Sequence, residues 1–212
     1  MKTCFIFGSI PTEVLPIMPC TDDLVIAADG GLKTLEKFNI NPDLIVGDFD
    51  SLEYTPVGDN VIKHPVQKDE TDTILAIDVA MSMGYDNFLI YGCLGGRLDH
   101  TVASIQTASY VSEKNANCLF IDNETYLTVI KETAINFNKE NKGIISIFSL
   151  SENAVGVSAS NLLYEVENSE LTSTFPLGVS NEFIGKPAKI SVKKGTLCVI
   201  WNGKHGTFKI GG

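Results

Sequence analysis

Short apolar runs alternate with helical stretches over the first 122 residues, and this alternation constrains the fold more than any other feature. The runs cover residues 3–7, 24–28, 44–46, 61–62, 88–91 and 118–121, and the helical stretches include 71–83 and 100–111. The runs are apolar throughout, as expected for strands buried on both faces of a sheet. They predict a Rossmann-like α/β domain, with a parallel sheet covered by helices on both faces.

The pattern changes after residue 123. Runs at 143–148, 189–192 and 196–200 are separated by Gly, Asn and Ser turns, without a convincing helix. This pattern favours a small antiparallel β-sandwich. The polar segment 136–142 is the natural linker, so we expect an α/β domain over 1–130 and a β-sandwich domain over 137–212.

Composition narrows the possible partners and compartment. Hydrophobic residues make up 44% of the chain, enough for a core, and the net charge of −10 argues against nucleic acid and anionic membranes as partners. The sequence contains five cysteines without a CxxC pair, no run long enough to span a membrane, and no signal-peptide pattern at its start. These features predict a cytoplasmic protein.

Polar, glycine-bearing clusters follow four of the apolar runs. Because ligands bind at the carboxyl ends of parallel strands, we expect these clusters to meet at one edge of the sheet. A fifth cluster opens the best helix and should join them. The clusters occupy residues 8–9, 29–31, 47–51, 92–100 and, at the helix start, 68–72.

Two clusters are rich in carboxylates. Asp48 and Asp50 flank one residue at a strand end, so both side chains can point to the same side and share a Mg²⁺ ion with Asp72. The structural alternative is an Asx turn that closes the strand. In the second cluster Asp69 could simply cap the helix, with Asp72 in its first turn, but Lys68 at a helix start also suits phosphate.

The stretch 92–100 carries the only arginine of the chain. Gly95 and Gly96 allow close backbone approach to an anion, and Arg97 beside them can bind phosphate in a bidentate manner. The alternative is an ordinary surface loop with an Arg97–Asp99 ion pair, and His100 could merely begin a helix.

Taken together and in this order, the motifs DGG (29–31), PDLIVGDFDS (42–51), KDETD (68–72) and GGRLDH (95–100) resemble the thiamine pyrophosphokinase (thiamine diphosphokinase) family. GVSNE (178–182) is similar to the thiamine-side loop of that family. The resemblance implies a homodimer in which thiamine binds where the catalytic domain of one chain meets the small domain of the other. It implies transfer of a pyrophosphoryl group from ATP to the thiamine hydroxyl, which gives thiamine diphosphate and AMP.

The resemblance also implies roles for individual residues. Asp48, Asp50 and Asp72 would hold Mg²⁺ and perform catalysis. The nucleotide side would comprise Gly8, Lys68, Thr71, Gly95, Gly96, Arg97, Asp99 and His100. The thiamine side would comprise Asp29, Gly30, Ser51, Ser180 and Asn181.

The chain departs from the family pattern at two positions. Some relatives carry Gln where Lys68 stands, so its phosphate role rests on charge. A tryptophan that stacks on the vitamin in vertebrate relatives lies about two positions from any natural alignment with Trp201, which could equally be a packing residue.

Two other functions are compatible with parts of the pattern. A metal-dependent phosphohydrolase also places DxD at a strand end, but it would use a covalent aspartyl intermediate and leave GGRLDH without a role. A nucleotide-binding module with an inert site is the non-enzymatic alternative. Thiamine-dependent formation of AMP from ATP distinguishes the kinase from both.

Overall fold

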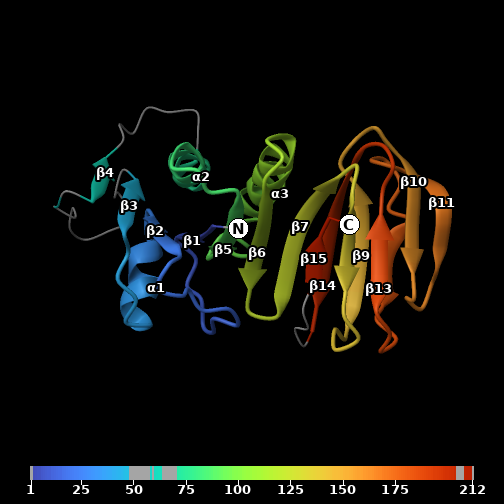
Figure 1. Ribbon diagram of the computed structural model, residues 1–212, viewed down its shortest axis with the longest axis horizontal. Coiled ribbons are helices and arrows are strands. Elements are labelled where there is room, and N and C mark those ends of the chain that lie inside the picture. The colour runs from blue at the N-terminus through green and yellow to red at the C-terminus, as the bar shows by residue number, and fades with distance from the viewer. Residues whose placement is uncertain (1, 48–57, 59, 64–70, 204–207, 212) are drawn as a thin grey trace. The chain divides into compact units, whose positions relative to one another are not determined.

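The computed structural model describes residues 2–47, 58, 60–63, 71–203 and 208–211 (Figure 1). The chain divides into two compact units. The first unit comprises Met1–Thr107 and Cys118–Asn123, and the second comprises Ala108–Asn117 and Glu124–Gly212. The expected domain ranges, 1–130 and 137–212, stay predictions.

The elements of the first unit follow the predicted alternation of strands and helices. They are β1 (Thr3–Phe7), β2 (Leu24–Ala28), α1 (Gly31–Lys37), β3 (Leu44–Gly47), β4 (Val61–Lys63), α2 (Asp72–Ser82), β5 (Asn87–Tyr91), the start of α3 (Leu98–Glu113) and β6 (Asn117–Asp122).

The strands of the first unit lie in the order β6-β5-β1-β2-β3-β4. The β1–β2, β1–β5, β2–β3 and β3–β4 pairs are parallel. The chain first runs outward from β1 to β4 and then returns to the other side of β1. Crossovers in opposite directions put α1 and α2 on opposite faces of these strands (Figure 1). The order reverses between β1 and β5, so a ligand crevice is expected beyond their carboxyl ends.

The start of α2 differs from the cap considered from sequence. Thr71, not Asp69, is the N-cap residue: its backbone is extended (φ −75°, ψ 152°), and its Oγ1 accepts a hydrogen bond from the Ile74 backbone N–H at 3.3 Å. Asp72 is therefore the first helical residue, where its charge suits the helix dipole. Asp69 lies outside the described residues.

The second unit is built from antiparallel strands. They are β7 (Thr125–Lys131), β8 (Ala134–Phe137), β9 (Ile144–Ser149), β10 (Asn153–Ser160), β11 (Val166–Thr172), β12 (Gly178–Glu182), β13 (Ala188–Ser191), β14 (Thr196–Asn202) and β15 (Phe208–Ile210). Strands β12, β9, β14 and β7 are consecutive neighbours, and the described residues of a second sheet have the order β11-β10-β13-β8-β15. The predicted α/β region followed by an antiparallel β region is confirmed.

An aromatic cluster joins the two sheets of this unit. Trp201 of β14 is 1% exposed, stacks on Tyr126 at 5.4 Å, and makes edge contacts with Phe137 of β8 at 5.2 Å and Phe208 of β15 at 5.3 Å. Its indole N–H has no hydrogen-bond partner within the described part of the chain. Of the two roles considered for Trp201, the structure shows packing.

The segment 136–142, predicted as a linker, is part of the second unit instead. Asn136 and Phe137 belong to β8, which pairs with both β13 and β15. The turn that follows buries Asn141, whose amide donates to the Asn138 side-chain oxygen at 2.9 Å. Composition suggested a linker because these residues are polar, but the Asn141 amide is satisfied within the turn, so burying this side chain costs little.

Among the described residues, no helix is both long and apolar enough to cross a bilayer.

The five cysteines are all free and differ sharply in accessibility. Cys20 is exposed, whereas Cys4, Cys93, Cys118 and Cys198 are buried. Burial raises the pKa of the Cys93 thiol to about 11 and that of Cys198 to about 12. Since the thiolate is the reactive form, we expect a thiol reagent at neutral pH to label one cysteine quickly and the others only on unfolding. A Cys20→Ser variant should lose the fast phase; a second fast thiol would contradict the buried core.

Candidate active site

The ends of β1 and β5 meet closely at the point where strand order reverses. The Gly8 backbone N–H donates to the Tyr91 carbonyl at 2.7 Å, and the Ile10 N–H donates to the Gly92 carbonyl at 2.9 Å. A Cβ atom on Gly8 would lie 2.7 Å from the Gly92 oxygen, and one on Gly92 would lie 2.5 Å from the Gly8 oxygen. Only glycine allows this approach at either position, which explains two of the glycines at the sheet edge.

Cys93 is the point where several elements of this edge come together. Its Sγ lies 3.5 Å from the Thr73 hydroxyl in the first turn of α2, and its carbonyl accepts from the Ser104 hydroxyl of α3 at 2.7 Å. A Cβ on Gly8 would lie 2.4 Å from the same Sγ. The end of β1, the start of α2 and the helix after the diglycine therefore surround one buried residue.

The DGG cluster at the end of β2 is tied to the end of β1. The Ser9 hydroxyl donates to Asp29 Oδ2 at 2.8 Å and accepts from the Gly30 backbone N–H at 3.3 Å. Asp29 has a left-handed backbone (φ 49°), and a Cβ on Gly47 at the end of β3 would lie 3.2 Å from the Asp29 Cα. The strand end that precedes Asp48 thus lies against Asp29.

The diglycine forms a left-handed loop at the amino end of α3. Gly95 and Gly96 have φ values of 79° and 61°, which L side chains rarely adopt. The Thr101 hydroxyl holds the loop, because it accepts from the Gly95 N–H at 3.2 Å. The loop is exposed and followed directly by a helix, the arrangement in which backbone N–H groups bind anions.

Arg97 and Asp99 form an exposed, two-point ion pair. Arg97 Nε donates to Asp99 Oδ1 at 3.1 Å and Nη2 to Oδ2 at 2.6 Å, while the His100 N–H also donates to Oδ1, at 3.0 Å. The hydrogen bond from Arg97 holds the pKa of Asp99 below its usual value. An exposed pair of this kind adds little stability. Its effect is to hold the guanidinium group in one orientation directly after Gly96.

The proposed magnesium ligands are only partly covered by the structure. Asp72 begins α2, one residue from the Thr73–Cys93 contact. Asp48, Asp50, Ser51 and Lys68 lie outside the described residues. Within the described ranges, no group of three or more His, Cys, Asp or Glu side chains forms a metal site. The three aspartates supply the hard oxygen donors that Mg²⁺ requires, and Gly47 brings the chain to Asp29 directly before Asp48.

Ser180 and Asn181, the predicted thiamine residues, lie in β12. Ser180 has a left-handed backbone (φ 61°), and the register of β12 against β9 shifts between Gly178 and Asn181. Such an irregularity redirects side chains and often accompanies a functional site. Asn181 has a structural role in addition: its side chain accepts from the Tyr164 N–H at 2.9 Å and donates to the Tyr164 carbonyl at 2.6 Å.

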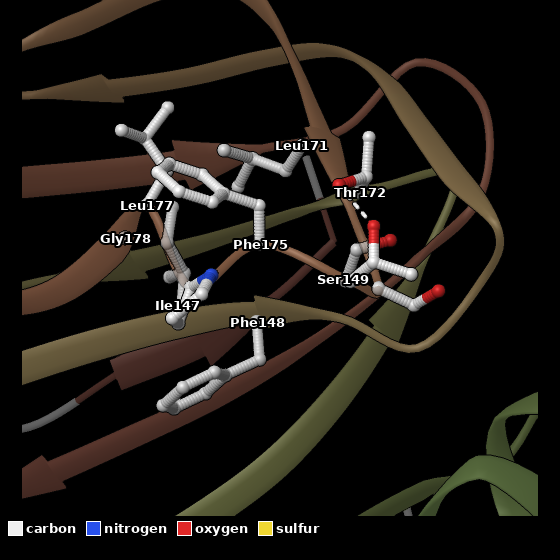
Figure 2. Close-up of a pocket in the computed structure, with 11 residues that line it drawn as sticks. Ile147, Phe148, Ser149, Leu171, Thr172, Phe175, Leu177 and Gly178 are labelled. Carbon is white, nitrogen blue, oxygen red and sulfur yellow. Dashed lines mark hydrogen bonds between the residues drawn. The ribbon is translucent and has the colours of Figure 1, made fainter.

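A pocket of about 290 Å³ opens in the second unit beside the start of β12. Leu171, Phe175 and Leu177 form an apolar end, and Thr172, which hydrogen-bonds to Thr174, lies at the other end with Ser149 (Figure 2). Gly178 lines the pocket and is the first residue of β12, two positions before Ser180, so the pocket adjoins the predicted thiamine strand.

Comparison with known proteins gives the family. The thiamin pyrophosphokinase catalytic domain matches residues 20–120, and the thiamin pyrophosphokinase vitamin B1 binding domain matches residues 132–197. The chain is 30% identical over 210 residues to thiamine pyrophosphokinase of Bacillus subtilis (strain 168), covering 94% of this chain and 98% of that protein. The chain belongs to the thiamine pyrophosphokinase family. It is an enzyme of that family, whose members transfer pyrophosphate from ATP to thiamine.

Solved structures of thiamine pyrophosphokinases share the fold. The crystal structure of the Bacillus subtilis thiamine pyrophosphokinase superposes with a TM-score of 0.84 at 28% identity, over 96% of this chain and 100% of that one. The Candida albicans thiamin pyrophosphokinase is 16% identical, with a TM-score of 0.76 over 95% of this chain and 90% of that one. At that identity the likeness shows the fold alone.

The sequence analysis assigned no individual role to several residues that support this edge. Ser9 joins the ends of β1 and β2, Thr101 holds Gly95, and Cys93 contacts two helices. Asp122, at the end of β6, follows the same rule of a polar residue after an apolar run. That rule could have identified Asp122, whereas the contacts of the other three appear only in the fold.

Proposed function

We propose that this member of the thiamine pyrophosphokinase family transfers the pyrophosphoryl group of ATP to thiamine with Mg²⁺ held by Asp48, Asp50 and Asp72. The observation that carries the proposal is the convergence on Cys93. Gly8, the first turn of α2 and α3 all contact this residue, which lies between Tyr91 and the diglycine. The amino end of α2, with Asp72, thereby lies at the same sheet edge as the loop suited to phosphate.

The reaction needs positive charge at this edge, because ATP is polyanionic and the chain has a net charge of −10. When bound, Mg²⁺ would neutralise phosphate charge between ATP and the aspartates. Arg97, Lys68 and the backbone N–H of Gly96 would then stabilise charge on the phosphates, while the Gly95 N–H stays bonded to the Thr101 hydroxyl. Asp99 acts on Arg97 by holding its guanidinium group in place.

The transfer is a substitution at the β-phosphorus of ATP. The thiamine hydroxyl oxygen forms a new bond to that phosphorus, the bond to the α–β bridging oxygen breaks, and AMP leaves with that oxygen. The hydroxyl proton goes to a carboxylate, for which Asp72 and Asp50 are the candidates.

The thiamine side and the assembly belong to the same proposal. Asp29, Gly30, Ser51, Ser180 and Asn181 would contact the vitamin in a homodimer whose site lies at the subunit interface. Exposed apolar side chains near Ser180 support an interface: Leu163, Tyr164 and Leu177 are 52%, 65% and 60% exposed. The free cysteines suit a cytoplasmic location.

The deciding experiment is a thiamine-dependent AMP assay with the purified protein, MgATP and thiamine. We expect equal amounts of AMP and thiamine diphosphate, and no AMP when thiamine is omitted. A chelator in excess should abolish the reaction, and Mg²⁺ should restore it. Formation of ADP or phosphate alone would contradict the proposal and favour a phosphohydrolase.

An Arg97→Lys variant tests the nucleotide side. Lysine keeps the charge but cannot form the two-point pair with Asp99, so the cation loses its fixed position. We expect the KM for ATP to rise by about 10-fold with little change in the KM for thiamine. An equal rise in both KM values would contradict a role specific to the nucleotide.

A further inference from the structure

Asp122 lies against the diglycine loop although it comes from a different strand. It is the last residue of β6, the neighbour of β5 in the sheet, and the loop follows β5. A Cβ built on Gly95 would be 3.5 Å from Asp122 Oδ2, so this carboxylate oxygen faces the side of Gly95 on which a side chain would stand. Gly96, the second glycine, faces Ile10 instead.

Local structure accounts for only one of the two carboxylate oxygens. The Asn123 side chain donates to Asp122 Oδ1 at 2.9 Å, within the tight turn after β6. No ion pair with Asp122 occurs among the described residues, and the guanidinium of Arg97 is held by Asp99. Oδ2 is the oxygen that faces the loop.

The environment of Asp122 disfavours its charge. Asp122 is half-buried, and burial raises the pKa of its carboxyl above the ordinary value. A raised carboxyl pKa means that the ionised form lowers the stability of the fold at neutral pH. A residue that destabilises the fold and faces a candidate binding loop is a candidate functional residue.

The chemistry of Asp122 identifies the part of a ligand that it would contact. An ionised carboxylate only accepts hydrogen bonds and repels phosphate, so it does not bind the anionic part of a nucleotide. A phosphate on the backbone N–H groups of the loop would place the attached sugar nearby, and the two ribose hydroxyls are donors. We propose that Asp122 is a specificity residue that accepts hydrogen bonds from the ribose hydroxyls of the nucleotide bound at the Gly95–Gly96 loop. This inference rests on the proposed nucleotide site.

The test compares AMP, 2′-deoxy-AMP and 3′-deoxy-AMP in calorimetric binding to the full chain. The corresponding triphosphates are compared as substrates in the thiamine-dependent assay. For the wild-type protein we expect at least one deoxy analogue to bind about 10- to 100-fold more weakly than AMP, because it lacks a hydrogen bond to a charged group. In Asp122→Asn, AMP should bind more weakly and the preference for ribose should largely disappear.

Asn123→Gly is the matched control. Asn123 has a left-handed backbone (φ 51°), so glycine keeps the turn while it removes the side-chain hydrogen bond to Asp122. We expect this variant to keep the ribose preference of the wild type. A second readout is thermal stability. Asp122→Asn should raise the Tm at neutral pH. It should not raise the Tm near pH 3, where the Asp122 carboxyl is mostly protonated in both the folded and the unfolded chain.

The outcomes separate this inference from the proposed function. Ribose preference lost in Asp122→Asn but kept in Asn123→Gly supports the inference, even if thiamine-dependent AMP formation fails. A wild-type protein that forms AMP from thiamine and ATP but accepts ribose and deoxyribose equally overturns the inference alone. Unchanged ribose preference in Asp122→Asn, or no binding of AMP by the folded protein, also overturns it.

Discussion

An Asp72→Asn variant is expected to lose thiamine-dependent AMP formation by about 10²- to 10⁴-fold, the effect of removing a general base or metal ligand. The neutral amide cannot accept the hydroxyl proton and is a poorer ligand for Mg²⁺. The steady-state rate with saturating ATP and thiamine measures the loss. ATP affinity should also become less dependent on Mg²⁺.

The fold should survive this change, because Thr71 rather than Asp72 caps α2. Thr71 supplies the N-cap hydrogen bond, which the variant keeps, and the lost interaction with the helix dipole is worth about 0.3–1 kcal/mol. Asp86→Asn is the matched control: Asp86 is exposed and precedes β5, at the opposite end of that strand from Gly92. We expect it to retain full activity. Equal losses in both variants, or an Asp72→Asn enzyme of normal rate, would contradict the assignment.

The meeting of described strand ends at one edge of the sheet could be predicted because it depends on topology and on glycine. Continuous apolar runs imply a parallel sheet, and a parallel sheet gathers the residues that follow its strands. Gly8 follows β1 and Gly92 follows β5, yet their backbones are in contact. This agrees with the expectation that the clusters after the strands meet at one edge of the sheet. The α2 cluster joins them through the Thr73–Cys93 contact.

The remaining features depend on contacts that periodicity does not encode. Asn141 looked like part of a linker because it is polar, but it is buried in a turn, where its amide donates to the Asn138 side-chain oxygen. Asn181 matched a thiamine motif, yet its side chain also binds the Tyr164 backbone, 17 positions away in the chain. Asp69 and Thr71 were both suitable caps by residue type, and the extended backbone of Thr71 decided between them. In each case a specific partner, rather than residue type, sets the role.

The largest expected effect on stability comes from Gly31→Ala, at the first residue of α1. A Cβ at this position would lie 1.7 Å from the Phe7 carbonyl oxygen and 2.4 Å from the Phe7 carbonyl carbon. Both are backbone atoms of the buried central strand β1, so neither can rotate away. Relief requires that α1 move from β1, and we expect a loss of about 3 kcal/mol or more in the free energy of unfolding. Urea denaturation measures this loss.

Gly84→Ala separates the steric effect from backbone strain. Gly84 follows α2 with φ 87°, and a Cβ there would meet nothing within 4 Å, so alanine costs only the strain of a left-handed backbone, about 1–2 kcal/mol. The same movement of α1 in Gly31→Ala would shift Gly30, whose backbone N–H donates to the Ser9 hydroxyl directly after Gly8. The enzyme that remains folded should therefore bind ATP more weakly than Gly84→Ala does. A Gly31→Ala variant that is no less stable than Gly84→Ala would contradict the close contact between Gly31 of α1 and the Phe7 carbonyl of β1.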